Sequence, residues 1–162
     1  MSIFLISSLF FVFTLLFSSL ILWRINTRKY ISSGTVASAY DSWTQDKLLE
    51  RLWGEHIHLG FYPPNKNIDF REAKVQFVHE LVSWSGLDKL PRGSRVLDVG
   101  CGIGGSSRIL ANYYGFNVTG ITISPAQVKR AKELTPYECT CNFKVMDALD
   151  LSFEAGTFDG VW

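Results

Sequence analysis

The run from Val96 to Gly105, which reads VLDVGCGIGG, most constrains how this 162-residue chain can fold. Its apolar first half predicts a buried strand over Arg95–Val99, and its glycine-rich second half predicts a tight turn that opens into a helix. Asn117–Thr122 predicts another strand, and Ser124 with Pro125 and Gln127 predicts the start of the next helix. Alternating strands and helices are typical of an α/β fold with a Rossmann-like parallel sheet.

Two more strands are predicted further along, over Asn142–Met146 and Phe158–Trp162. The sequence stops at the second of these, and we therefore expect the sheet to be truncated after about its fourth strand. A short amphipathic helix is predicted from Tyr40 to Leu52. A longer one is predicted after Asp69, where Glu72 completes a capping-box pattern, and Gly86 is its predicted stop.

The charge and cysteine content exclude several classes of partner. The chain has 16 basic and 15 acidic residues, and this balance gives no electrostatic footprint for nucleic acid. Its three cysteines do not have the spacing of a zinc site, so no metal is expected. Aromatic residues make up 14% of the sequence, and several lie together before the glycine loop, which favours an apolar, lipophilic small-molecule partner.

Asp98 decides which cofactor suits the glycine loop. A pyrophosphate at the start of the following helix would be repelled by a carboxylate in the same crevice. S-adenosylmethionine carries a sulfonium and an ammonium group, which an acidic strand end attracts, and a carboxylate, which the loop amides can approach. The absence of a Gly-Lys-Ser/Thr ending excludes a P-loop. The sequence therefore predicts S-adenosylmethionine as the cofactor.

The ends of the next two strands complete the predicted cofactor site. Thr122 stands where many nucleotide-binding sheets place an acid for the ribose, and Gln127 is a second possible partner. Asp147 can accept the adenine amino proton, and the Ala148 amide can meet a ring nitrogen. The cofactor-binding residues predicted from the sequence are Asp98, Gly100, Cys101, Gly102, Gly104, Thr122, Ile123, Gln127, Asp147 and Ala148.

His56 and His58 are the candidate catalytic residues. They lie in the segment expected to fold over the cofactor, and imidazole is a suitable general base near neutral pH. Spaced two apart, they would point to opposite sides of an extended segment, so both cannot serve alike. A purely structural role, with each ring bonded to the local backbone, is equally compatible with the sequence.

The stretch from Ile3 to Trp23 contains no charged residue, and as a helix it would be long enough to cross a bilayer. Arg24, Arg28 and Lys29 follow it, which predicts that the rest of the chain lies on the cytoplasmic side. These features predict a single-pass protein of the plasma or thylakoid membrane, held by its N-terminal helix. A buried core helix and an uncleaved signal-like leader are the alternatives.

Three segments resemble one family: Val96–Leu110, Asn117–Ala131 and Trp53–Tyr62. The chain is similar to the 2-methyl-6-phytylbenzoquinol and tocopherol methyltransferases, which belong to the class I S-adenosylmethionine-dependent methyltransferases. The resemblance implies methylation of a ring carbon of a prenylated quinol on the route to tocopherol and plastoquinone. Sterol, fatty-acyl and small-amine acceptors, or an inactive cofactor-binding fragment, remain alternatives.

The predicted organisation therefore has four parts. Residues 1–23 are expected to be a transmembrane anchor, and residues 24–39 a linker. Residues 40–92 are expected to form a helical cap, and residues 93–162 part of an S-adenosylmethionine-binding domain.

Overall fold

The computed structural model describes residues 12–21 and 32–162. The chain divides into two units, residues 1–32 and residues 33–162. In the first unit, residues 12–21 are helical.

No helix in the described ranges is long and apolar enough to cross a membrane. This finding corrects the predicted transmembrane helix, and with it the assignment as a single-pass membrane protein held by that helix. The other residues of the predicted anchor, 1–11 and 22–23, lie outside the described residues.

The second unit begins with two helices, α2 (Ser33–Gln45) and α3 (Leu48–Trp53). The sequence predicts a single helix over 40–52. The structure instead breaks it at Lys47, whose left-handed backbone (φ 51°) separates the two helices. Helix α2 also begins inside the segment predicted as a linker.

Helix α4 (Phe70–Ser85) has the ends that its sequence predicts. The Asp69 carboxylate accepts hydrogen bonds from the amides of Arg71 (2.7 Å) and Glu72 (3.0 Å), which satisfies two free donors of the first turn. Gly86 ends the helix with the left-handed conformation (φ 74°) that glycine adopts without steric cost. A single turn of 3-10 helix, η1 (Leu87–Lys89), then leads to the sheet.

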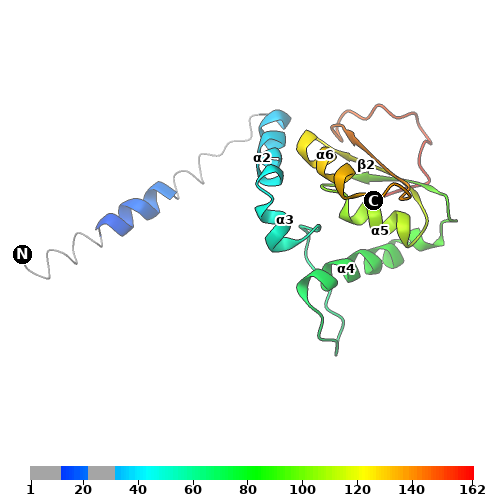
Figure 1. The fold of residues 1–162 in the computed structure, drawn as a ribbon, viewed down its shortest axis with the longest axis horizontal. Helices are drawn as coiled ribbons and strands as arrows, with labels where there is room; N and C mark the ends of the chain where they lie inside the picture. The colour runs from blue at the N-terminus through cyan, green and yellow to red at the C-terminus, as the bar shows by residue number, and fades with distance from the viewer. Residues whose placement is uncertain (1–11, 22–31) are drawn as a thin grey trace, which may run out of the picture. The chain divides into compact units, whose positions relative to one another are not determined.

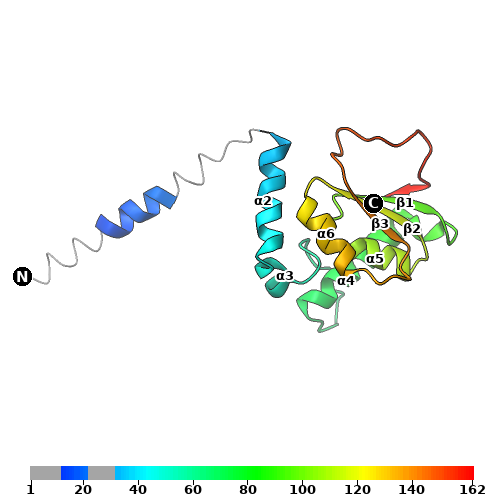
Figure 2. The same cartoon turned by 45° about the horizontal axis from the view of Figure 1, so that its top comes forward.

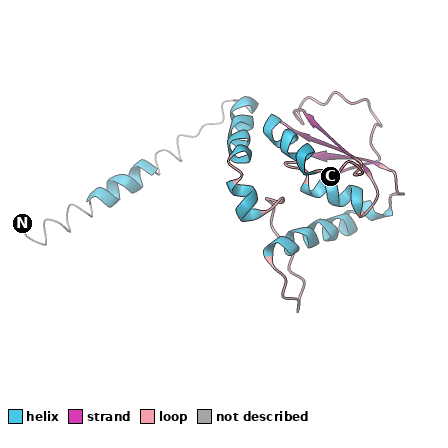
Figure 3. Ribbon diagram, in the orientation of Figure 1, coloured by secondary structure: helices cyan, strands magenta, loops and turns pink. Residues whose placement is uncertain are grey.

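Four parallel strands form one sheet in the order β3-β2-β1-β4. Figure 1 labels β2 beside helices α5 and α6, Figure 2 labels β1, β2 and β3, and Figure 3 draws the strands in magenta. The strands are β1 (Arg95–Val99), β2 (Asn117–Thr122), β3 (Cys141–Val145) and β4 (Gly160–Val161). Val96 pairs with Val118 across β1 and β2, so both strands reach the same edge of the sheet. The predicted Rossmann-like parallel sheet is confirmed.

Two crossover helices connect the first three strands: α5 (Gly105–Asn112) and α6 (Pro125–Leu134). Because both crossovers run in the same direction along the sheet and such connections are right-handed, both helices lie on one face. Ser124 caps α6 by accepting the Gln127 amide (3.1 Å), as the sequence predicts.

The core lies between this sheet and the helices. Its main cluster includes Val82 of α4, Val96 of β1, Leu110 of α5 and Val118 of β2. A smaller cluster under α6 joins Val128 and Ala131 to Phe143 and Cys101. This packing fixes the carboxyl end of β1, from which the glycine loop emerges.

Candidate functional site

The glycine loop turns sharply at the end of β1. The amides of Gly100 (2.9 Å) and Cys101 (3.0 Å) both donate to the Ile121 carbonyl of the neighbouring strand. Gly100 (φ 79°) and Gly102 (φ 55°) have left-handed backbones, and a Cβ atom added at either position would enter open space. The loop therefore presents bare backbone to a hollow at the carboxyl edge of the sheet.

That hollow is a pocket of about 540 Å³. It is bounded by the ends of β1 and β2, the glycine loop, the segment after β3, and part of residues 40–92 (the cap segment). The residues that line it are Tyr40, Glu55, His56, Ile57, His58, Asp98, Val99, Gly100, Cys101, Gly102, Ile103, Gly105, Ser106, Ile121, Thr122, Ile123, Gln127, Met146, Ala148 and Trp162.

Two residues of the pocket lining have backbone amides without an acceptor among the described residues. Among the described residues, the Gly102 and Ile103 amides have no hydrogen-bond partner, and both residues line the pocket. Helix α5 begins directly afterwards, and Gly104 at its N-cap provides no side-chain cap. An uncapped helix start with free amides suits a carboxylate or another acceptor-rich group.

Asp98 lies beneath the loop with 3% of its surface exposed. Its carboxylate accepts a hydrogen bond from the Ser107 hydroxyl of α5 (2.5 Å). Burial raises the pKa of the Asp98 carboxyl to about 6, and the Ser107 hydrogen bond offsets only part of this effect. The carboxylate has no cationic side chain bonded to it within the described part of the chain. A cationic ligand would supply the missing charge.

Thr122 and Gln127 meet at the end of β2. The Thr122 hydroxyl donates to the Gln127 side-chain oxygen (2.7 Å), and both side chains are buried. The Ser124 amide donates to the Thr122 oxygen (3.3 Å). Because Oε1 of Gln127 is occupied, the amide nitrogen of this side chain is the group available to a ligand in the pocket.

The structure brings most predicted cofactor residues to the pocket and leaves two outside its lining. Gly104 faces the opposite way, since an added Cβ would lie 2.7 Å from the ring of Phe143. The Asp147 carboxylate accepts the Leu149 amide (2.9 Å) in a local turn. Cys101, Ile123 and Ala148 line the pocket. Burial raises the pKa of the Cys101 thiol to about 12, which favours a packing role over a nucleophilic one.

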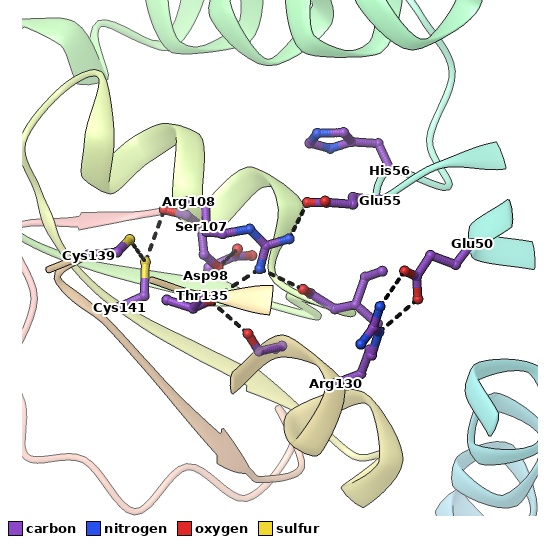
Figure 4. A network of polar contacts seen from close by, with 12 residues as sticks. Glu50, Glu55, His56, Asp98, Ser107, Arg108, Arg130, Thr135, Cys139 and Cys141 are labelled. Atoms are coloured by element: carbon purple, nitrogen blue, oxygen red, sulfur yellow. Dashed lines mark hydrogen bonds and ion pairs between the residues drawn. The ribbon is translucent and has the colours of Figure 1, made fainter. Parts of the chain in front are cut away.

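The histidine segment, Trp53–His58, reaches the pocket from the cap. It has no regular secondary structure after Gly54, and two buried cations hold it. Figure 4 shows one of them, Arg108, beside Glu55. Lys74 of α4 donates to the carbonyls of Trp53 (2.9 Å) and His56 (2.7 Å). Arg108 of α5 pairs with the Glu55 carboxylate and also donates to the Ile103 carbonyl of the glycine loop (2.9 Å).

His56 and His58 lie side by side and both line the pocket. Nε2 of His58 is 3.2 Å from Nδ1 of His56, and Nδ1 of His58 is 2.7 Å from the Leu59 carbonyl oxygen. Burial lowers the pKa of His56 to about 4, and the neighbouring His58 contributes to this shift. His56 is therefore neutral at physiological pH.

Several residues at the site were not predicted from the sequence. Tyr40 and Trp162 line the pocket, while Lys74 and Arg108 hold its cap side. Trp162 follows β4 at the edge where the other strand ends meet, and this position could have identified it as a pocket residue. The lysine and arginine have ordinary positions on amphipathic helices, and nothing in their spacing distinguishes them.

Comparison with known proteins places the sheet in a family. A family model described as "Methyltransferase domain" matches residues 96–162. Residues 96–162 belong to this methyltransferase family. The matched range begins in β1 and contains the glycine loop and the strand ends that line the pocket.

One relative of this methyltransferase domain has a closely similar sequence. The chain is 62% identical over 143 residues to a 2-methyl-6-phytyl-1,4-hydroquinone methyltransferase of Synechocystis sp., covering 87% of this chain and 45% of the relative. The chain therefore spans less than half the length of that curated relative.

Two solved structures share the fold. The cyclase SpnF has a TM-score of 0.71 at 27% identity, covering 81% of this chain and 48% of its own. The magnesium protoporphyrin IX methyltransferase of Synechocystis PCC 6803 with bound SAM has a TM-score of 0.57 at 27% identity, covering 83% of this chain and 62% of its own. One neighbour is named a cyclase, so the fold alone does not specify the reaction.

Proposed function

We propose that the protein transfers a methyl group from S-adenosylmethionine to a ring carbon of a lipophilic prenylated hydroquinone. The observation that carries the proposal is the buried Asp98 carboxylate, which lies under a glycine loop with free amides and has no cationic side chain bonded to it. This donor and acceptor set fits a ligand that carries positive charge beside a carboxylate. The Synechocystis relative, by its name, acts on a phytylated hydroquinone.

The predicted contacts that line the pocket have places in this proposal. Asp98 attracts the cationic end of the cofactor, and the amides after Gly102 receive its carboxylate. Thr122 and Gln127 stand beside the ribose, with the Gln127 amide nitrogen as a donor. The backbone after β3, at Ala148, meets the adenine. In this reading residues 93–162 hold the cofactor and residues 40–92 form the cap over the acceptor.

The cofactor supplies the methyl group when it is bound. Most of what a protein contributes to such a displacement is alignment of the reactants and exclusion of water. The glycine loop and the strand ends align one reactant, and the histidine segment closes the pocket from the cap side. The paired histidines are the groups in the cap that can hold a proton of the acceptor.

The test is methyl transfer by the whole protein from labelled S-adenosylmethionine. The acceptors are a phytylated benzoquinol, a sterol, a fatty-acyl ester and a small amine. We expect label in the quinol, on a ring carbon rather than an oxygen. Label in amines or sterols alone would contradict the proposed acceptor, and no transfer to any acceptor by a protein that binds the cofactor would contradict the proposed reaction.

A further inference from the structure

The hydrogen bonds around the two histidines assign each ring nitrogen a role. The Leu59 carbonyl can only accept, so Nδ1 of His58, 2.7 Å away, carries a hydrogen. In the neutral ring, Nε2 of His58 then has a free lone pair. That nitrogen lies 3.2 Å from Nδ1 of His56, which must therefore be the donor. With both rings neutral, each therefore carries its hydrogen on Nδ1.

This arrangement leaves one ring nitrogen of the pair uncommitted. Nε2 of His56 is without its hydrogen and has no partner among the described residues. No described side-chain nitrogen is both buried and unpartnered, so this atom is accessible to a ligand. Its ring lines the pocket. An imidazole nitrogen with a free lone pair can accept a proton from a hydroxyl group.

Several contacts fix the position of this nitrogen. The His56 carbonyl accepts from buried Lys74 (2.7 Å), and the adjacent Glu55 pairs with Arg108. The imidazole lies against the start of α5, where a Cβ added at Gly105 would be 2.8 Å from Cε1 of His56. Nδ1 of His56 is oriented by His58, whose own ring packs against Phe77 with centroids 5.4 Å apart. The ring is therefore held before any acceptor arrives.

Resting on the proposed function, we propose that Nε2 of His56 takes the hydroxyl proton of the hydroquinone, and that His58 is a positioning residue that keeps that nitrogen unprotonated. The reaction forms a bond from the ring carbon to the methyl group and breaks the methyl–sulfur bond, leaving its electron pair on sulfur. His56 takes the hydroxyl proton, which becomes strongly acidic as the ring loses electron density. The ring carbon then releases its own hydrogen to water, and His56 returns its proton to the oxygen.

A lone pair that is free at neutral pH suits this role. Burial holds the pKa of His56 at about 4, so its lone pair is not already protonated at working pH. The proton it accepts comes from a hydroxyl that is far more acidic during carbon–carbon bond formation than in the free hydroquinone. A general base of this kind contributes roughly 100- to 10,000-fold to a rate.

The test joins kinetics to a direct observation of the tautomers. We expect His56→Gln to lower kcat for the quinol by about 100-fold or more, with unchanged affinity for S-adenosylhomocysteine. His58→Ala should lower kcat by about 10-fold, and His58→Gln should restore most of it, because its side-chain oxygen can still accept from Nδ1 of His56. His79→Gln, which replaces a histidine outside the pocket lining, is the matched control and should leave kcat unchanged.

Nitrogen-15 NMR of the histidine-labelled protein gives a readout independent of activity. Both His56 and His58 should show the Nδ1–H tautomer, and His58→Ala should convert His56 to the Nε2–H form. An Nε2–H tautomer at His56 in the wild type, or a kcat of His56→Gln within threefold of wild type, would overturn this inference alone. Absence of methyl transfer to the quinol by the wild-type protein would overturn the proposed function and this inference with it.

Discussion

The glycine loop and the histidine segment face each other across one pocket, yet they are held in different ways. The loop obtains its shape from left-handed glycines and from hydrogen bonds to the adjacent strand. The histidine segment has almost no regular structure and depends on Lys74 and Arg108, which lie on other elements. Local sequence therefore determines the cofactor side of the pocket, and tertiary contacts determine the cap side.

The largest effect is expected on the cofactor side, from Asp98→Asn. Removing the charge while keeping the shape should weaken S-adenosylhomocysteine binding by about 100-fold, or ~3 kcal/mol. Calorimetric titration measures this change, with Asp150→Asn, an exposed acid outside the pocket lining, as the control. Equal affinity of the wild type and Asp98→Asn would show that this carboxylate does not contact the ligand.

The same substitution should stabilise the ligand-free protein. The folded-state pKa of Asp98 is raised to about 6 from 3.8, so the folded protein favours the protonated carboxyl. The contribution of this preference to the unfolding free energy is present below about pH 4 and is lost as pH rises through 6. The loss is at most about 3 kcal/mol. The difference in unfolding free energy between Asp98→Asn and wild type should therefore grow between pH 4 and pH 7. A difference that does not change with pH would contradict the assigned shift.

On the cap side, Arg108→Met should have the largest effect. The Arg108 side chain is 10% exposed and bonds to the Ile103 carbonyl, the Thr135 hydroxyl and the Glu55 carboxylate. Its removal should lower the unfolding free energy by about 2–3 kcal/mol, because buried acceptors lose a charged donor. Denaturant unfolding measures this loss. Arg95→Met, at a side chain 54% exposed, is the matched control and should cost under ~1 kcal/mol.

Lys74→Met should have an intermediate effect. Methionine keeps much of the apolar stem but leaves the Trp53 and His56 carbonyls without their donor, at a cost of about 1–2 kcal/mol. Hydrogen exchange should quicken in the histidine segment and stay unchanged in the strands. Equal acceleration in β1 and β2 would mean that Lys74 stabilises the whole unit rather than this segment.

Glu55→Gln should have the smallest effect. Its side chain is 45% exposed, so solvent screens its attraction to Arg108 and the loss should stay below ~1 kcal/mol. A double-mutant cycle with Arg108→Met measures the coupling between the two side chains. A coupling above ~2 kcal/mol would show that the Glu55–Arg108 ion pair, rather than the hydrogen bond from the Arg108 side chain to the Ile103 carbonyl, holds the histidine segment.

Much of the sheet unit could be predicted because its signals are local. The bounds of β1 and β2, the caps at Asp69 and Ser124, and the stop at Gly86 all follow from short patterns that the structure reproduces. Helix α2 was harder to predict, because its Ser- and Gly-containing start reads as a linker. It is stabilised from outside: Asp41 accepts from the Ser124 hydroxyl and the Ala126 amide (3.0 Å) at the start of α6.

The candidate site divides in the same way. Asp98, Thr122 and Ala148 were predicted because strand ends meet at one edge of a parallel sheet, and each of them lines the pocket. The pairing of His56 with His58 was not predicted, since an extended segment would send the two rings to opposite sides. The bend that brings their nitrogens to 3.2 Å depends on contacts with α4 and α5, which no local pattern encodes.

The most direct test of the account is calorimetric titration of the protein with S-adenosylhomocysteine, with NADH as the comparison ligand. Asp98 beneath free amides should favour the sulfur cofactor and repel a pyrophosphate. We predict saturable heat with S-adenosylhomocysteine and none with NADH. No heat at millimolar S-adenosylhomocysteine from protein with a folded circular-dichroism spectrum, or equal affinity for NADH, would contradict the central claim.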